Sequence, residues 1–198
     1  MQSNTRARRP QLLAALAMSA TAVVALAACD SGGSSTDAGT DGTNSATAGP
    51  ALPKASNMAS IASYLNQFGS CLNLTPGQEY DASDENEKNP AWGEDEAADP
   101  TWGIGERAVC TDRYSDAIAL LSVPDMRTFQ TAAKKDGHAG FLIGTDFAVV
   151  PVDARTVQDL SASGLRYLTC DRDFTAPSGY EKQPALVDGC VLSTYVPA

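Results

Sequence analysis

The sequence predicts an α+β domain, and three kinds of pattern support this prediction. Apolar runs of strand length, amphipathic stretches at helical spacing and glycines that separate them follow one another between Ser56 and Cys170. The 143 residues from position 56 onward are enough for one domain with a core of its own. We therefore expect a single folded domain over residues 56–198.

A helix is predicted at the start of this domain, over residues 57–68. Ser56 precedes it, Gly69 ends it, and its apolar residues recur at helical spacing: Met58, Ile61, Leu65 and Phe68. Cys71 lies just past its end. The following stretch, up to Ser115, lacks periodicity and is rich in Asp, Glu, Asn, Pro and Gly, which predicts a long acidic loop or insertion.

Strands and helices then alternate from Ser115 onward. Residues 117–121 form a continuous apolar run, as expected for a strand that is covered on both faces. Pro124 and Asp125 begin an amphipathic helix that ends at Gly137.

A hairpin, a second helix and a last strand follow. The apolar runs 141–143 and 147–150 flank Gly144-Thr145-Asp146, which predicts a β-hairpin. Asp153 can cap a helix that Gly164 ends, and residues 165–170 predict a strand.

The predicted order, β-α-β-β-α-β, is the split βαβ or ferredoxin-like arrangement. In this arrangement a four-stranded antiparallel sheet carries both helices on one face. The first and third strands are the most uniformly apolar, which suits the central pair. The helix at 57–68 and the acidic loop would then cover the other face.

The N-terminus has the features of a bacterial lipoprotein signal. Three arginines, at positions 6, 8 and 9, precede an apolar stretch that leads through Leu26-Ala27-Ala28 into Cys29. In the lipoproteins that this pattern resembles, a diacylglycerol is attached to the Cys thiol, which becomes the first mature residue. The resemblance implies a membrane anchor at Cys29 and a place on the extracellular face of the cytoplasmic membrane. An uncleaved transmembrane helix is the alternative.

Residues 30–55 predict a disordered tether that follows the lipidated Cys29. They contain a single Leu and no aromatic residue, so they cannot bury enough apolar surface to offset the loss of chain entropy. Such a tether could lift the domain from the bilayer into the wall zone. A glycosylated stalk is the other interpretation of its Ser and Thr content.

Four cysteines remain after Cys29, and they are Cys71, Cys110, Cys170 and Cys190. An exported chain meets an oxidising compartment, so an even set predicts two disulfides rather than metal ligands or redox thiols. Four cysteines permit three pairings, and the residues alone leave the choice open.

The order of elements also resembles that of a group of small actinobacterial lipoproteins to which no function is assigned. The likeness spans residues 57–165 and rests on the order helix, Cys71, acidic loop, Cys110-Thr111, strand, helix, hairpin and helix. It implies the disulfides Cys71–Cys110 and Cys170–Cys190.

The mature chain is strongly acidic. Residues 1–28 contain three arginines and no acid, so their removal leaves 11 basic against 24 acidic residues, a net charge of −13. Such a charge repels anionic lipid and nucleic acid, which excludes nucleic acid as a partner. Solubility is the simplest explanation of this negative charge. We expect the protein to be a monomer.

The clearest local motif is a ten-residue internal repeat. Residues 89–93, Asn-Pro-Ala-Trp-Gly, with Glu96 recur as residues 99–103, Asp-Pro-Thr-Trp-Gly, with Glu106. Trp92 and Trp102, beside Glu96 and Glu106, are candidate ligand-binding residues that could stack on a sugar or contact a cationic peptide. Alternatively, both indoles cover the open face of the sheet. We expect Trp102 to be buried, because it lies closer to Cys110.

Patterns typical of catalysis are weak. The chain has one histidine, His138, expected to be exposed in a loop, and it has neither HExxH nor G-x-S-x-G. The acidic loop lacks the glycine and terminal Glu of an EF-hand. We therefore expect no catalytic residue, cofactor or metal, and a non-catalytic binding or structural module whose partner is a wall component or a surface protein. A wall-active hydrolase that uses Glu96 and Glu106 is the alternative.

Overall fold

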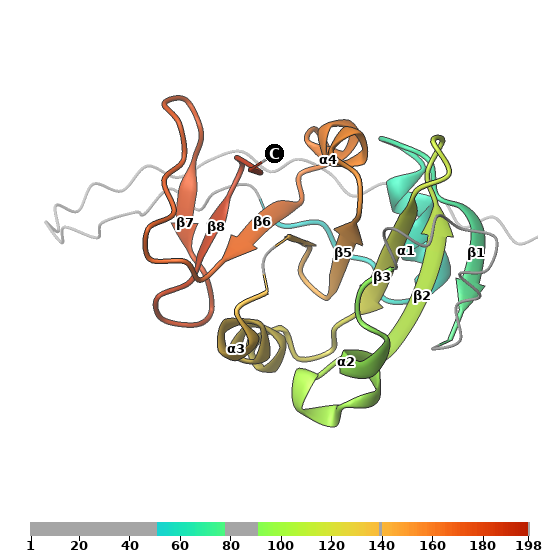
Figure 1. Ribbon diagram of the computed structural model, residues 1–198, viewed down its shortest axis with the longest axis horizontal. Helices are drawn as coiled ribbons and strands as arrows, with labels where there is room; N and C mark the ends of the chain where they lie inside the picture. Colours follow the sequence, from blue (N-terminus) through green and yellow to red (C-terminus); the bar gives the residue numbers. More distant parts are fainter. Residues whose placement is uncertain (1–50, 78–90, 139, 198) are drawn as a thin grey trace, which may run out of the picture. The chain divides into compact units, whose positions relative to one another are not determined.

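A computed structural model describes residues 51–77, 91–138 and 140–197 of the chain. These residues form an α+β fold around one antiparallel sheet (Figure 1). The strands lie side by side in the order β1 (Leu72–Pro76), β2 (Glu106–Thr111), β3 (Ala117–Ser122), β5 (Phe147–Pro151), β4 (Phe141–Ile143), β6 (Arg166–Thr169), β8 (Val191–Ser193) and β7 (Lys182–Pro184). The helices are α1 (Met58–Leu65), α2 (Glu94–Ala98), the short 3-10 helix η2 (Pro100–Trp102), α3 (Met126–Asp136) and α4 (Ala154–Leu160).

Strand β3 lies near the middle of the sheet, and each of its residues is buried. It pairs with β2 on one side and β5 on the other, so that Ala119 lies opposite both Val109 and Val150. Apolar side chains therefore suit both of its faces. The runs 117–121 and 147–150 are neighbours, as predicted, but they are the third and fourth strands of eight rather than the central pair of a four-stranded sheet.

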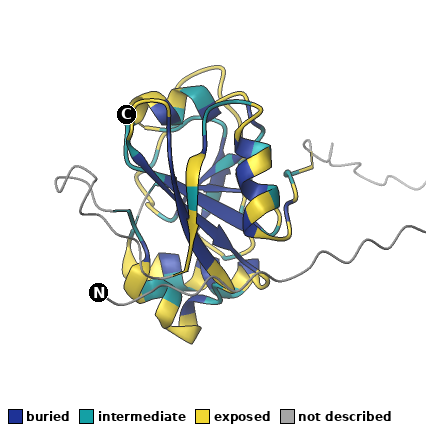
Figure 2. Ribbon diagram, turned by 90° about the vertical axis from the view of Figure 1, so that its right-hand side faces the viewer, coloured by how far each residue is buried: buried dark blue, intermediate teal, exposed yellow. Residues whose placement is uncertain are grey.

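Two layers of helix cover the two faces of the sheet. On one face, Ile61 and Leu65 of α1 and Leu160 of α4 belong to a core with alternate residues of the strands, such as Leu120 and Val149. On the other face, Phe129 of α3 and Trp102 of η2 belong to a second core with Leu121, Phe141 and Ile143. Figure 2 shows the buried strands between helices whose outer sides are exposed.

Polar caps set the ends of the helices. The Asn57 side chain accepts a hydrogen bond from the Ser60 N–H and the Ser60 hydroxyl accepts one from the Asn57 N–H, a reciprocal capping box that starts α1. The expected helix at 57–68 thus begins one residue after Asn57 and ends at Leu65. Asp125 caps α3 and Asp153 caps α4, as predicted.

The ferredoxin-like arrangement is not confirmed by the strand order. Strands β3, β5 and β4 are neighbours, as that arrangement requires, but β6 pairs with β4 rather than with β3. The place beside β3 is taken by β2, which reaches it through the short turn at 112–116. Helices α3 and α4 also belong to cores on opposite faces of the sheet. In Figure 1, α3 lies below the sheet and α4 above it.

Strands β1, β2, β7 and β8 lie where the sequence predicts no strand. The expected loop after Cys71 holds β1, α2, η2 and β2, while its residues 78–90 lie outside the described residues. Strands β7 and β8 are three residues each and mix polar with apolar side chains, so they carry little periodic signal.

The folded body begins before the expected boundary at residue 56. Ala55 is buried and its N–H donates to Asp146 Oδ1 at 2.9 Å, while the Thr145 N–H donates to the Pro53 carbonyl at 2.7 Å. A Cβ atom at Gly144 would lie 2.6 Å from that same carbonyl oxygen, so only glycine allows this close approach. Residues 53–55 therefore belong to the body rather than to a tether. The expected signal, Cys29 and residues 30–50 of the expected tether lie outside the described residues.

Two disulfides join the sheet to its neighbouring segments. Cys71 is bonded to Cys110 of β2, and Cys170, just after β6, is bonded to Cys190, just before β8. The pairing that the resemblance implies is confirmed. Structural disulfides are typical of proteins in an oxidising compartment outside the cytoplasm. None of the helices within the described ranges has the length and hydropathy that crossing a bilayer requires.

Candidate functional site

The two halves of the tryptophan repeat fold back onto the sheet beside α3. The ring centroids of Trp92 and Trp102 lie 5.2 Å apart in an edge-to-face arrangement. Three further rings join them, and we call the five together the aromatic cluster: Trp92, Trp102, Phe129, His138 and Phe141.

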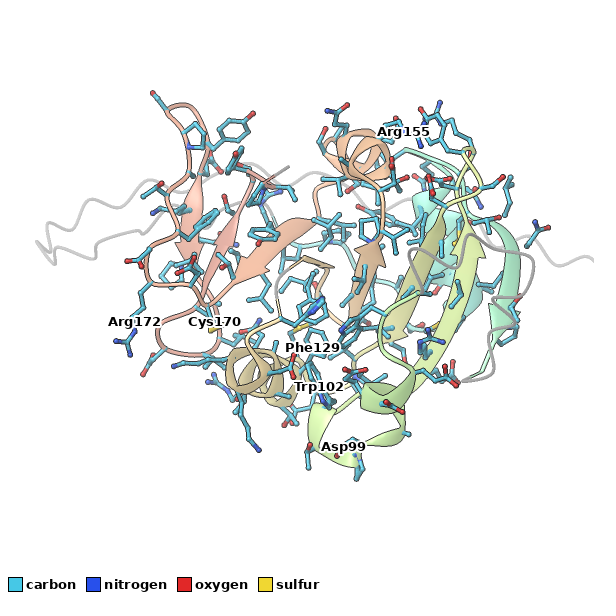
Figure 3. All side chains as sticks on the ribbon, viewed as in Figure 1. Asp99, Trp102, Phe129, Arg155, Cys170 and Arg172 are labelled. Atoms are coloured by element: carbon cyan, nitrogen blue, oxygen red, sulfur yellow. A yellow bond between two sulfur atoms is a disulfide. The ribbon has the colours of Figure 1, made fainter. Side chains whose placement is uncertain are left out.

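Trp102 is the inner member of the aromatic cluster. Its side chain packs on Phe129 and Phe141, with centroid distances of 5.9 and 6.3 Å, and only 7% of the residue is exposed. The prediction that Trp102 is buried is confirmed, whereas Trp92 is half-buried. Figure 3 shows Trp102 and Phe129 turned toward the interior, while Asp99 points outward. The repeat thus acts largely as a cover for one face of the sheet.

Local capping explains why the second copy of the repeat adopts this shape. The Asp99 side chain accepts a hydrogen bond from the Thr101 N–H at 2.8 Å, and Pro100 occupies the first turn of η2. Gly103 ends η2 with a φ of 66°, a left-handed value that favours glycine. The turn is thus fixed at both ends, and Trp102 at its end is buried.

Arg107 fixes the first copy of the repeat. This arginine lies on β2 and is 3% exposed. Its Nε donates to the Trp92 carbonyl and its Nη2 to the Ala91 carbonyl, each at 3.1 Å. Charge-assisted hydrogen bonds of this kind are stronger than neutral ones. The sequence analysis missed this contact, because it assigned residue 107 to a loop.

His138 is half-buried rather than exposed, which corrects the sequence-based expectation. Its ring lies 5.1 Å from Trp92 and 4.9 Å from Phe141, and its Nε2 is buried without a hydrogen-bond partner among the described residues. Burial lowers the pKa of His138, and the nearby carboxylates of Asp136 and Glu96 partly oppose this effect. The lowered pKa favours the uncharged imidazole, which packs as an aromatic ring.

The carboxylates predicted to accompany the tryptophans lie in different surroundings. Glu106 lines a groove of about 420 Å³ with Met58 and Arg107, to which Glu96 does not contribute. Glu96 is close enough to His138 to influence its pKa. A glycosidase needs two carboxyl groups that flank one bond, and these two do not share this groove.

A second groove, of about 500 Å³, runs along the outer edge of the aromatic cluster. Trp102 contributes to it from η2, and α3 contributes Thr131, Lys135 and Asp136. Asp99 lies on the rim, where hydrogen bonds from the Thr101 backbone hold its pKa below the usual value. Within the described ranges, no group of three or more His, Cys, Asp or Glu residues is placed to hold a metal ion.

A second set of aromatic side chains lies near the C-terminus and was not found by the sequence analysis. It consists of Tyr167 on β6 and three residues of the segments around β7 and β8, and we call it the C-terminal aromatic row: Tyr167, Phe174, Tyr195 and Tyr180. Their spacing in the sequence follows no helical or strand period. The only signal in the sequence is that several tyrosines lie close to turn residues.

Comparisons with known proteins identify no relative. No family model, no curated protein and no solved structure matches the chain. The candidate sites are therefore argued from the contacts of their own residues.

The burial of Trp102 leads to a prediction about stability. Replacement of Trp102 by Ala should lower the free energy of unfolding by about 3–5 kcal/mol, because the loss of a buried indole leaves a cavity beside Phe129. Urea unfolding followed by far-ultraviolet circular dichroism measures this change. The matched control is Trp92→Ala, which should cost clearly less, and equal small losses for both variants would show that Trp102 is not part of the core.

His138 leads to a prediction about pH. Its folded pKa is lowered, so an unfolded chain binds a proton near pH 6.5 before the folded chain does. The free energy of unfolding should therefore fall as the pH drops below about 6.5, until the folded pKa is passed. The difference between wild type and His138→Gln, measured by urea unfolding at pH 7 and pH 5, isolates this part. An identical pH dependence in the two proteins would contradict the prediction.

Proposed function

We propose that the protein is a non-catalytic binding or structural module held at the extracellular face of the cytoplasmic membrane by a diacylglycerol on Cys29. The observation that carries this proposal is the pair of disulfides, Cys71–Cys110 and Cys170–Cys190. Such bonds persist in oxidising compartments, which agrees with the export implied by the residues before Cys29. The aromatic surfaces around the sheet supply contacts for a partner.

The chemical surroundings of the polar residues support a non-catalytic role. His138 lies against aromatic rings, and its buried Nε2 has no hydrogen-bond partner among the described residues. Asp99 and Asp125 accept backbone N–H bonds at the starts of η2 and α3, which lowers the pKa of each carboxyl group. Carboxylates held ionised in this way suit helix capping, whereas a general acid needs a raised pKa.

The proposed partner is a wall component or another surface protein, and the protein itself acts as a monomer. The net charge of −10 for the whole chain makes anionic lipid and nucleic acid poor partners. A partner whose surface is uncharged or of mixed charge is not repelled in this way.

The anchor is tested by replacement of Cys29. In cells that express the full chain, Cys29→Ala should accumulate as an unprocessed precursor without lipid, because the thiol that accepts the diacylglycerol is lost. Intact-mass spectrometry detects both changes, and Cys71→Ala serves as the control that keeps the lipid. Full acylation of the Cys29→Ala protein would refute the anchor.

The binding role is tested with isolated cell walls. The full chain in detergent should sediment with the walls and should release no soluble sugar or peptide fragments, because no catalytic step is proposed. The pellet obtained without walls is the control. Fragments that appear with the wild type and disappear with Glu96→Gln or Glu106→Gln would instead identify a hydrolase.

A further inference from the structure

The sheet extends past the helices on the face that carries α1 and α4. Strands β8 and β7 continue it beyond β6, and in Figure 1 they lie at the end of the sheet, to the side of α4. Tyr167 is paired with Ser193, and Ser193 with Lys182, so these three residues point to the same face. Ser193 is buried, whereas Lys182 at the outer strand is exposed. Loop residues, rather than a helix, therefore lie over this part of the face.

The C-terminal aromatic row lies over this part of the sheet and runs from the core to solvent. Its successive ring centroids are 5.7, 6.4 and 5.0 Å apart, from Tyr167 through Phe174 and Tyr195 to Tyr180. Tyr167 is 6% exposed and belongs to the core, whereas Tyr180 is 50% exposed. The buried end fixes the row in place, and the outer rings present surface to solvent.

Two grooves adjoin inner rings of the row, one at Phe174 and one at Tyr167. One, of about 460 Å³, is lined by Phe174 and by polar residues that include Arg172 and Lys182. The other, of about 410 Å³, is lined by Tyr167 and Val196 together with Gln158 of α4. Neither groove is lined by Tyr180 or Tyr195, so the exposed ring of Tyr180 adds contact surface outside them.

We propose that the C-terminal aromatic row and its two grooves bind a glycan strand of linked pyranose rings. The C–H faces of a pyranose pack against the electron-rich faces of Tyr and Phe, while its hydroxyl groups need polar partners at the rim. Arg172, Lys182 and Gln158 supply such partners. This inference rests on the proposed function, because it names the wall component that the module binds.

A second copy of this chain fits the surface less well. Strand β7 is an edge strand of the sheet and carries Lys182 and Pro184, residue types that block pairing with another strand. Among the described residues, Tyr114 is the other exposed tyrosine, and the guanidinium groups of Arg155 and Arg113 lie 4.1 and 5.5 Å from its ring centre. Tyr114 lies outside the C-terminal aromatic row, so it provides a matched control for Tyr180.

The test is isothermal titration of the full chain in detergent with two glycans. One is a neutral pentamer of N-acetylglucosamine, and the other is peptidoglycan strands from which an amidase has removed the peptides. We expect at least one to bind, with Kd raised about tenfold or more by Tyr180→Ala or Tyr195→Ala, as for exposed hot-spot aromatics. Tyr114→Ala should leave Kd unchanged, and the glycan that binds identifies the source.

Two outcomes would overturn the inference: binding of neither glycan by the wild type, or equal binding by wild type and Tyr180→Ala. Tyr180→Phe keeps the ring and should retain binding, which separates a contact from a folding defect, and melting temperatures check that the variants are folded.

Sedimentation with whole walls separates this inference from the proposed function. If Tyr180→Ala still sediments like the wild type, the glycan surface is wrong but the wall-binding module stands. If the wild type neither sediments nor binds a glycan, both proposals fall.

Discussion

The antiparallel pairing of β3 with both β2 and β5 is the interaction on which the rest of the structure depends. It buries each residue of β3 and gives the sheet two apolar faces, so two separate helix layers are needed. Helices α1 and α4 cover one face, and α3 with the tryptophan segment covers the other. Because β2 occupies the place beside β3, β6 extends the opposite end of the sheet, where β8 and β7 follow.

The sequence predicts the parts of this fold whose signals are local. Asp125 and Gly137 mark both ends of α3, and Gly144 lies within the hairpin of β4 and β5, because caps and turns depend on neighbouring residues. Strand β2 was missed because Glu106 and Arg107 at its start leave an apolar run of only three residues, 108–110. Arg107 is buried in the fold, where the distant Ala91 and Trp92 carbonyls accept its hydrogen bonds. The predicted position of β6 beside β3 was also wrong, because β2 pairs with that edge of β3 and β6 pairs with β4 instead.

The two aromatic groups show the same limit for the candidate sites. The repeat around Trp92 and Trp102 is visible in the sequence, and the structure uses Trp102 mainly to cover the sheet. The C-terminal row has no repeat, because Tyr167 and Tyr195 meet through Phe174 only after β6 and β8 have paired. Contacts that depend on strand pairing cannot be found from spacing along the chain. A motif that is visible in the sequence, such as the tryptophan repeat, can therefore be structural, while residues without any motif form the exposed aromatic surface.

The disulfide between Cys170 and Cys190 has a consequence for recognition as well as for stability. It closes the segment that carries Phe174 and Tyr180 into a covalent loop, with a sequence separation of 20 residues. A loop without a helix of its own would otherwise lose much conformational freedom when a ligand orders it. Because the bond restricts this freedom before any encounter, the rings are largely preorganised. Reduction of this one bond would then weaken the proposed glycan binding through entropy, although no side chain of the aromatic row had changed.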